Sequence, residues 1–263
     1  MDLGLKGKIA LVAAASKGLG RAVAEELAAE GAHLVLCARG EAELRATAAA
    51  LEAASGVPVL AVPADLSAPG APAAVVAAAL ARFGRVDVLV TNAGGPPAGG
   101  FDGLTAEMWD AATRLLLTSV VELTRAVLPG MKAQGWGRIL NITSISVKQP
   151  VDNLMLSNSL RAAVTGMART LATEVAPFGI TVNNILPGYT RTARVENLAQ
   201  AIATRDGIAP TEAQARWENE IPMRRLGEPR EFGALAAFLC SARASYITAT
   251  SIPVDGGWIK GLL

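Results

Sequence analysis

Short apolar runs and longer amphipathic stretches alternate along the first third of the chain. Each apolar run has the length of one strand, and a run such as Ile9-Ala-Leu-Val-Ala-Ala14 is typical of a parallel strand covered on both faces. Each amphipathic stretch has a helical period and is followed by glycine or Ser-Gly. The pattern predicts strands over residues 9–14, 33–37, 57–62 and 86–90, with helices over 21–30, 41–54 and 71–83 between them.

The second half repeats this alternation with longer helices. It predicts helices over residues 106–133, 154–176 and 228–241, and strands over 138–143, 179–186 and 251–254. The polar segment 189–223, which contains Gly207 and Pro210, interrupts the rhythm, and we expect a lid there with one or two short helices. The whole order predicts a single α/β domain over residues 1–263, a doubly wound Rossmann-type fold with a parallel sheet of about seven strands and helices on both faces.

Charge and cysteine content exclude several classes of function. Of 263 residues, 24 are Lys or Arg and 23 are Asp or Glu, so a net charge of +1 argues against a nucleic-acid or membrane surface. Two cysteines without a CxxC pair, and one histidine, are too few for a zinc site, so no metal is expected. We expect a cytoplasmic protein, because the N-terminus lacks a signal-peptide pattern and prolines break the long uncharged stretch 66–81.

Glycines mark the turn between the first predicted strand and helix. Gly18 and Gly20 would let the backbone approach a pyrophosphate at the N-terminus of the helix, where unpaired N–H groups and the helix dipole favour anions. The neighbouring Ser16, Lys17 and Leu19 would share this contact. Alone, the turn is a weak signal, because glycines at such turns also serve packing.

Further motifs follow in an order that strengthens the nucleotide-binding interpretation. They are Thr91-Asn92-Ala93-Gly94 after the fourth strand, Asp65-Leu66 after the third, Asn141-Ile142-Thr143-Ser144 at the fifth, Pro187-Gly188 with Thr190 and Thr192 after the sixth, and the closing segment 252–257. With the glycine turn, in which Ala13 and Ala14 replace the usual Thr-Gly, this set resembles the short-chain dehydrogenase/reductase family from about Leu5 to Gly257, and 3-oxoacyl-acyl-carrier-protein reductases in particular.

The resemblance implies which residues would contact a nicotinamide dinucleotide. They are Ser16, Lys17, Gly18, Leu19, Gly20, Arg39, Asp65, Leu66, Asn92, Ala93, Gly94, Arg161, Pro187, Gly188, Thr190 and Thr192. Enzymes that prefer NAD carry an acid at the end of the second strand, but this chain has Ala38-Arg39 there. Because Arg39 and Lys17 could pair with a 2′-phosphate, we expect NADP(H) to be preferred over NAD(H). The alternative is that both cations are simply solvated.

The catalytic residues of the family are mostly absent. The register of the long helix sets Ser157 at the family's tyrosine and Arg161 at its lysine, while Leu116 replaces an asparagine and Ser144 is retained. A serine hydroxyl is a far weaker acid than a phenol, and an arginine does not give up its proton. Tyr189, directly after the Pro-Gly turn, is the other candidate proton donor, with the alternative that it only shapes the pocket.

Two functions remain open at this point. The first is an NADP(H)-dependent oxidoreductase that interconverts a carbonyl and an alcohol on a small molecule, with Ser144, Ser157, Arg161 and Tyr189 as the catalytic candidates. The second is a dinucleotide-binding sensor or scaffold without dehydrogenase turnover. We also expect a homodimer or homotetramer, because the predicted helices 106–133 and 154–176 carry few charges on their Ala- and Leu-rich faces.

Overall fold

A parallel sheet forms the centre of the protein. The computed structural model describes residues 1–262, and its seven strands lie in the order β3-β2-β1-β4-β5-β6-β7. All neighbouring pairs in this sheet are parallel. The strands are β1 (Ile9–Ala13), β2 (His33–Ala38), β3 (Val59–Pro63), β4 (Val88–Thr91), β5 (Gly137–Ile142), β6 (Ile180–Pro187) and β7 (Ser251–Val254). The predicted doubly wound fold is confirmed.

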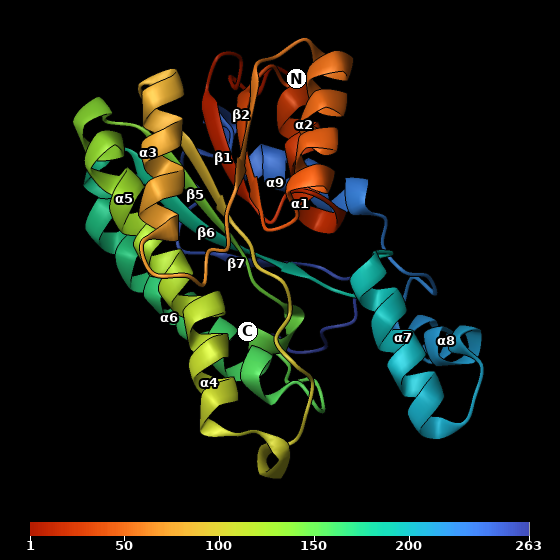
Figure 1. Ribbon diagram of the computed structural model, residues 1–263. Coiled ribbons are helices and arrows are strands. Elements are labelled where there is room, and N and C mark those ends of the chain that lie inside the picture. The colour runs from red at the N-terminus through yellow and green to blue at the C-terminus, as the bar shows by residue number, and fades with distance from the viewer. Residues whose placement is uncertain (263) are drawn as a thin grey trace.

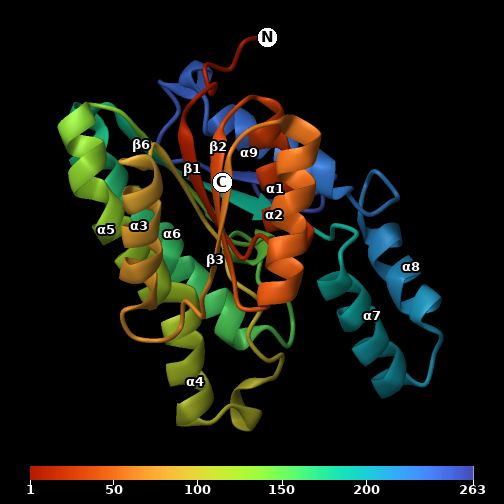
Figure 2. The same cartoon turned by 45° about the horizontal axis from the view of Figure 1, so that its top comes forward.

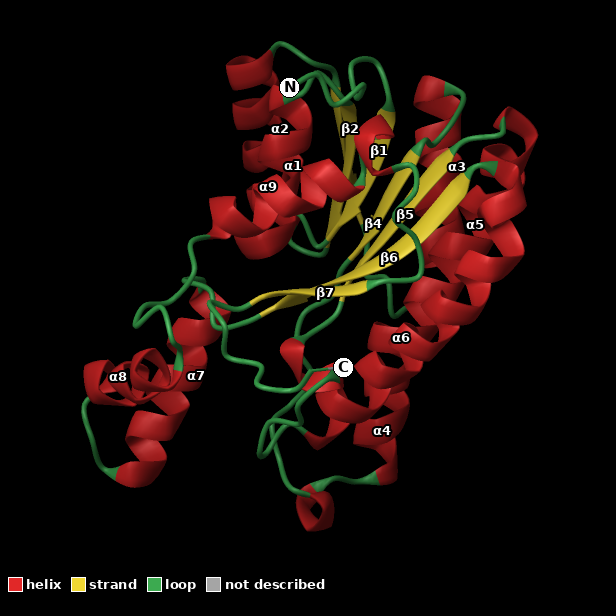
Figure 3. Cartoon of the chain, turned by 180° about the vertical axis from the view of Figure 1, so that it is seen from behind, coloured by secondary structure: helices red, strands yellow, loops and turns green. Residues whose placement is uncertain are grey.

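Helices cover both faces of this sheet. One face packs against α1 (Gly18–Ala29), α2 (Glu41–Ser55) and α9 (Pro229–Leu239), and the other against α3 (Ala71–Phe83), α5 (Ser119–Gln134) and α6 (Met155–Val175) (Figures 1 and 3). Each face has its own apolar cluster, and alternate residues of one strand belong to different clusters, as Ala10 and Leu11 do. Among residues 1–262, every helix falls short of the length and apolarity needed to cross a bilayer.

The helix predicted over residues 106–133 is interrupted. The structure has α4 (Ala106–Thr113), a π-helical turn over Arg114–Thr118, and then α5. The wider turn adds a residue per turn and rotates α5 relative to α4, so that Leu115 reaches the cavity described below while Leu116 is buried behind it. A hydrophobic period does not reveal such a turn, because the residues on both sides of it remain helical.

A ladder of polar side chains crosses the four neighbouring strands β4 to β7. Thr91 Oγ1 donates to Asn141 Oδ1 at 2.7 Å, Asn141 Nδ2 donates to Asn184 Oδ1 at 3.1 Å, and Asn184 Nδ2 donates to Ser251 Oγ at 3.1 Å. Thr91, Asn141 and Asn184 are all buried. Because buried amides must keep their partners, the ladder helps to fix the register of β4, β5, β6 and β7.

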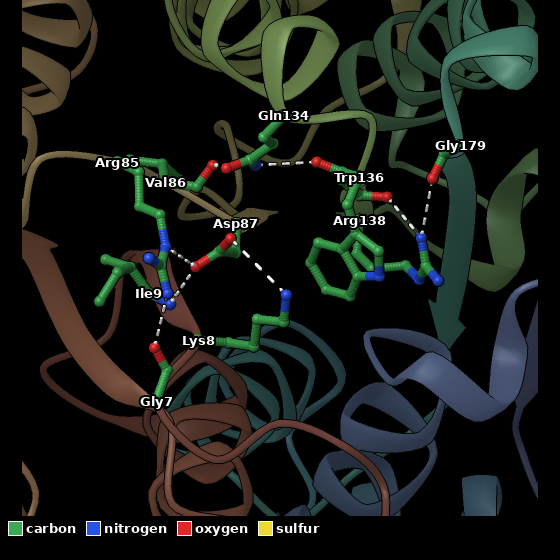
Figure 4. A network of polar contacts seen from close by, with 11 residues as sticks. Gly7, Lys8, Ile9, Arg85, Val86, Asp87, Gln134, Trp136, Arg138 and Gly179 are labelled. Atoms are coloured by element: carbon green, nitrogen blue, oxygen red, sulfur yellow. Dashed lines mark hydrogen bonds and ion pairs between the residues drawn. The ribbon is translucent and has the colours of Figure 1, made fainter.

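A second polar network lies at the opposite edge, where the strands begin (Figure 4). The buried carboxylate of Asp87 accepts the Ile9 N–H at 2.8 Å and Arg85 Nε at 2.9 Å. Arg138, also buried, lies over the ring of Trp136 and donates to backbone carbonyls. These contacts stabilise the sheet on the side away from the functional loops.

Two helices, α7 (Ala193–Asp206) and α8 (Pro210–Glu220), make up most of the segment predicted as a lid, and they project from the end of the sheet (Figures 1 and 2). They pack on each other around Ala199, Ala213 and Trp217, which belong to an apolar cluster separate from the two sheet clusters. The same cluster includes Leu186 of β6 and Ile145 after β5, so it also joins this segment to the end of the sheet.

Candidate cofactor and active site

A cavity of about 910 Å³ lies at the edge of the sheet where the strands end. Its wall runs from the loop after β1 and the end of β2, past the loops after β3, β4 and β5, to the segment between β6 and α7. In doubly wound folds this edge is where ligands bind. Nearly every residue that the sequence predicts for cofactor binding lines it: Ser16, Lys17, Gly18, Leu19, Arg39, Asp65, Leu66, Asn92, Ala93, Gly94, Arg161, Pro187, Gly188, Thr190 and Thr192.

Gly20 is the exception. It is buried in α1 and does not line the cavity, and a Cβ built on it would lie 2.3 Å from the carbonyl oxygen of Ala14. The absence of a side chain at Gly20 therefore allows α1 to pack closely against the end of β1. Gly18, by contrast, lies in the wall with φ of +59°, and Lys17 at the N-cap makes no side-chain capping bond. The first N–H groups of α1 therefore have no side-chain cap, as an anion site at a helix N-terminus requires.

An acid that the sequence analysis missed faces the same end of the cavity. Glu43, in the first turn of α2, accepts from Ser16 Oγ at 3.0 Å and from Lys17 Nζ at 3.4 Å. Lys17 is thus paired with a carboxylate, whereas Arg39 is exposed in the wall close to Asp65. Bonds from the Ser67 hydroxyl and N–H lower the pKa of Asp65, and the charge of Arg39 lowers it further.

Ser144, Ser157 and Arg161 meet at the other end of the cavity. Ser144 caps a short 3₁₀ turn after β5 by accepting the Ser146 N–H at 3.1 Å. Ser157 and Arg161 are one turn apart on α6, so their side chains share a face, and Arg161 Nε donates to Ser157 Oγ at 3.2 Å. Arg161 also donates from a terminal nitrogen to the carbonyl of Ile142 at 3.0 Å. The structure therefore brings together three of the four predicted catalytic residues.

The charge of Arg161 is held in a poorly solvated place. Burial and, to a smaller extent, the nearby charge of Arg194 together lower the pKa of its guanidinium to about 10. Arg194 comes from the first turn of α7, and its terminal nitrogen donates to the carbonyl of Pro96, in the loop after β4, at 3.4 Å. No motif in the sequence distinguishes Arg194 from the other arginines of its polar segment, and only the fold brings it to Arg161.

Tyr189 lines the cavity but is held by aromatic packing. Its ring stacks on Trp217 with centroids 4.7 Å apart and meets Trp258 edge-on at 6.0 Å. Burial raises the pKa of its phenol to about 12, and the charges of Glu220 and Asp152 act in the same direction. Because the ring is held against two tryptophans, its position fits a packing role.

Leu116 stands beside a small void behind Arg161. The void, of about 10 Å³, is also lined by Asn92, Thr143 and Arg161. The hydroxyl of Thr143 is buried and finds no hydrogen-bond partner within residues 1–262. An aliphatic side chain at position 116 therefore leaves a buried polar atom unsatisfied where a side-chain amide would supply a partner.

A seven-stranded parallel sheet with a glycine turn and a cavity at its carboxyl edge is the arrangement of a dinucleotide-binding Rossmann-type fold. Comparison with known proteins makes the assignment specific. Residues 13–259 match the family model described as enoyl-(acyl carrier protein) reductase. The chain is 34% identical over 258 residues to D-beta-hydroxybutyrate dehydrogenase of Cupriavidus necator, covering 97% of this chain and 99% of that protein.

Solved structures agree with this match. L-sorbose reductase from Gluconobacter frateurii, complexed with NADPH and L-sorbose, superposes with a TM-score of 0.95 and 36% identity over the whole of both chains. A variant of actinorhodin polyketide ketoreductase with NADPH gives a TM-score of 0.92 and 34% identity, covering 97% of this chain and 98% of the other. The chain belongs to the short-chain dehydrogenase/reductase family, and it is an oxidoreductase of that family.

Proposed function

We propose that the protein is an NADP(H)-dependent oxidoreductase that interconverts a carbonyl and an alcohol on a small molecule. One observation carries the proposal: a single cavity joins the glycine turn and Arg39 at one end to Ser144, Ser157 and Arg161 at the other. Relatives whose names describe a ketoreductase, a sorbose reductase and a hydroxybutyrate dehydrogenase support the same class of reaction.

The cavity suits an extended dinucleotide. The uncapped start of α1 at Gly18 fits a pyrophosphate, and Arg39 is the cation available to a 2′-phosphate, since Lys17 is paired with Glu43. Two similar solved structures contain NADPH, which supports this choice of cofactor. When bound, the reduced nicotinamide supplies the hydride, and the protein has to orient the carbonyl and deliver a proton.

Ser157 is the proposed proton-bearing group at the carbonyl oxygen. Its Oγ accepts the Nε–H of Arg161, so its own O–H proton is available to a substrate oxygen, and the donated bond makes that hydroxyl a stronger donor. Ser144, in the wall beside it, would hold the same oxygen. A serine remains a weak acid, so we expect slower reduction than in an enzyme with a phenol, by about 10²–10⁴-fold.

The test combines binding with turnover. Affinities for NADPH and NADH are measured by calorimetry, and NADPH absorbance is followed with a panel of ketones, sugars and 3-oxoacyl thioesters. NADPH consumption that is lost in Ser157→Ala and Arg161→Met supports the proposal. The competing function, a dinucleotide-binding sensor, is favoured by the packed Tyr189 and the absent phenol, and tight NADPH binding without turnover on any substrate class would establish it instead.

We also propose that the protein works as a homodimer or homotetramer. The outer face of α6 leaves Ala162, Ala163 and Gly166 exposed, and small residues of this kind let two helices approach closely. Light scattering at micromolar protein concentration should give a multiple of the 27.0 kDa chain mass. A monomer at that concentration would contradict this proposal without touching the catalytic one.

A further inference from the structure

Two arginines from different elements enter the same end of the cavity. Arg161 rises from α6 beside Ser157, and Arg194 crosses from α7 to the carbonyl of Pro96. The backbone makes room for the second one, because a Cβ on Gly95 would lie 2.7 Å from a terminal nitrogen of Arg194. Arg194 thus lies against a glycine at the cavity wall, with its side chain still exposed.

Neither guanidinium has a carboxylate partner. Within residues 1–262, no Asp or Glu oxygen lies within 4.0 Å of Arg161 or Arg194. Both groups donate to Ser157 or to backbone carbonyls, which leaves further N–H groups of each without a protein acceptor. Other arginines of the same region are paired: Arg191 with Glu228, Arg205 and Arg216 with Asp206, and Arg225 with Glu231.

Two unpaired cations that repel each other are costly to hold in a partly desolvated cavity. Burial and the charge of Arg194 both disfavour the charged form of Arg161, and no opposing acid offsets them. The four acids that also line the cavity do not pair with either arginine: Glu43 pairs with Lys17, Glu25 pairs with Arg21, and Asp65 bonds with Ser67. Glu196, in the first turn of α7, forms no ion pair within 4.0 Å in the described part of the chain. An anion supplied by a ligand would remove this cost.

We propose that Arg161 and Arg194 together bind an anionic oxygen group, a carboxylate or a phosphate, carried by the substrate itself. The inference rests on the proposed function, since it names the substrate class of that site. Arg161 touches Ser157 at 3.2 Å, so the anion and the reacting carbonyl must lie within a few atoms of each other. The substrate class is therefore a small oxo acid or oxo phosphate, or the corresponding hydroxy compound.

The proposed anion preference is tested with matched pairs of ligands in the complex with NADP⁺. The oxidised cofactor has no hydride to transfer, so the oxo compound binds without being reduced. The probes are 3-oxobutanoate against its methyl ester, and hydroxyacetone phosphate against hydroxyacetone, titrated by calorimetry. We expect at least one anion to bind about 10-fold or more tighter than its neutral partner, the usual effect of a charge-assisted contact. Whether the carboxylate or the phosphate shows the preference identifies the group.

Three variants locate the effect. Arg194→Gln removes the charge and Gly95→Ala displaces the guanidinium, and each should reduce the preference for the anion about 10-fold. Arg205→Gln, at the far end of the same helix α7, is the matched control and should leave the preference unchanged. The affinity for NADP⁺ should be the same in all three, because Gly18 and Arg39 hold the cofactor phosphates in the proposed site.

The outcomes separate this inference from the proposed function. If NADP⁺ binds but both anions bind no better than their neutral partners, the inference is wrong and the proposed function stands. If Arg194→Gln weakens the binding of NADP⁺ as much as the binding of the anion, Arg194 contacts the cofactor and the inference is again wrong. If NADP(H) does not bind, the proposed function fails, and the same titrations on the cofactor-free protein decide the anion site alone.

Discussion

Rebuilding a phenol and an ammonium on α6 is the sharpest test of the altered active site. The double substitution Ser157→Tyr with Arg161→Lys puts both groups one turn apart on the face that lines the cavity. The lysine charge would favour the ionised phenol and bring its pKa closer to neutrality. We expect carbonyl reduction to rise by about 10²-fold, and by up to about 10⁴-fold if the full effect of a general acid is recovered.

The structure also indicates how these substitutions affect packing and stability. Ser157 is 8% exposed, so a tyrosine ring must extend into the cavity, which has room for it. Replacing Arg161 loses its bond to the Ile142 carbonyl, worth about 1 kcal/mol. Adding Leu116→Asn would exchange a buried aliphatic group for an amide able to satisfy Thr143 Oγ1 in the adjacent void. The triple variant should therefore gain activity at a moderate loss of thermal stability.

The assay is NADPH consumption by the unmodified protein and the variants on one substrate, with cofactor affinity measured in parallel. Ser157→Phe with Arg161→Lys is the matched control, because it has the same bulk and charge without the hydroxyl. The reasoning is refuted if the tyrosine variant is no faster than the phenylalanine variant while both fold and bind NADPH. It is also refuted if the unmodified protein turns over with a pH dependence that disappears in Tyr189→Phe.

Three further predictions concern the cofactor end of the cavity, the packing of α1 and the anion site. Arg39→Ala should lower the affinity ratio of NADPH to NADH about 10-fold, and Glu43→Gln should raise it by removing a carboxylate near the 2′-phosphate, both measured by fluorescence titration. Gly20→Ala should lower stability by about 2 kcal/mol or more in thermal unfolding, whereas Gly40→Ala, with open space around it, should not. Anion affinity should stay constant between pH 7 and pH 9, because Arg161 keeps its charge there even though burial and the charge of Arg194 lower its pKa, and a loss of affinity by calorimetry across that range would contradict this.

The sequence predicted the sheet and most of the cofactor wall, because both depend on local patterns. Buried parallel strands are continuous apolar runs, as at Ile9 and Val88, and the motif at Thr91-Asn92 directly follows its strand. The π turn at Arg114–Thr118 was not predicted because it changes the phase of the helix without changing its composition. The lid helices were expected, although whether this segment moves remains a prediction.

The parts of the site that the sequence did not predict come from elements distant in the chain. Glu43 reaches Ser16 across 27 residues, and Arg194 reaches Pro96 across 98. Neither belongs to a motif, and an exposed helix is equally compatible with a glutamate or arginine that faces water. Gly20 was predicted as a ligand contact, whereas the carbonyl of Ala14 beside it makes it a packing residue, a distinction that only distances supply.

The separate apolar cluster under α7 and α8 has a consequence for how the protein can diversify. Trp217, Trp258 and Ile221 belong to this cluster, which is distinct from the clusters on the two faces of the sheet and meets the sheet at Leu186 of β6. Mutations in this unit can change which molecules enter the cavity without disturbing the strands that carry the glycine turn. Substrate range can therefore change through substitutions in this unit while the two sheet clusters, which hold most of the buried apolar residues, are conserved.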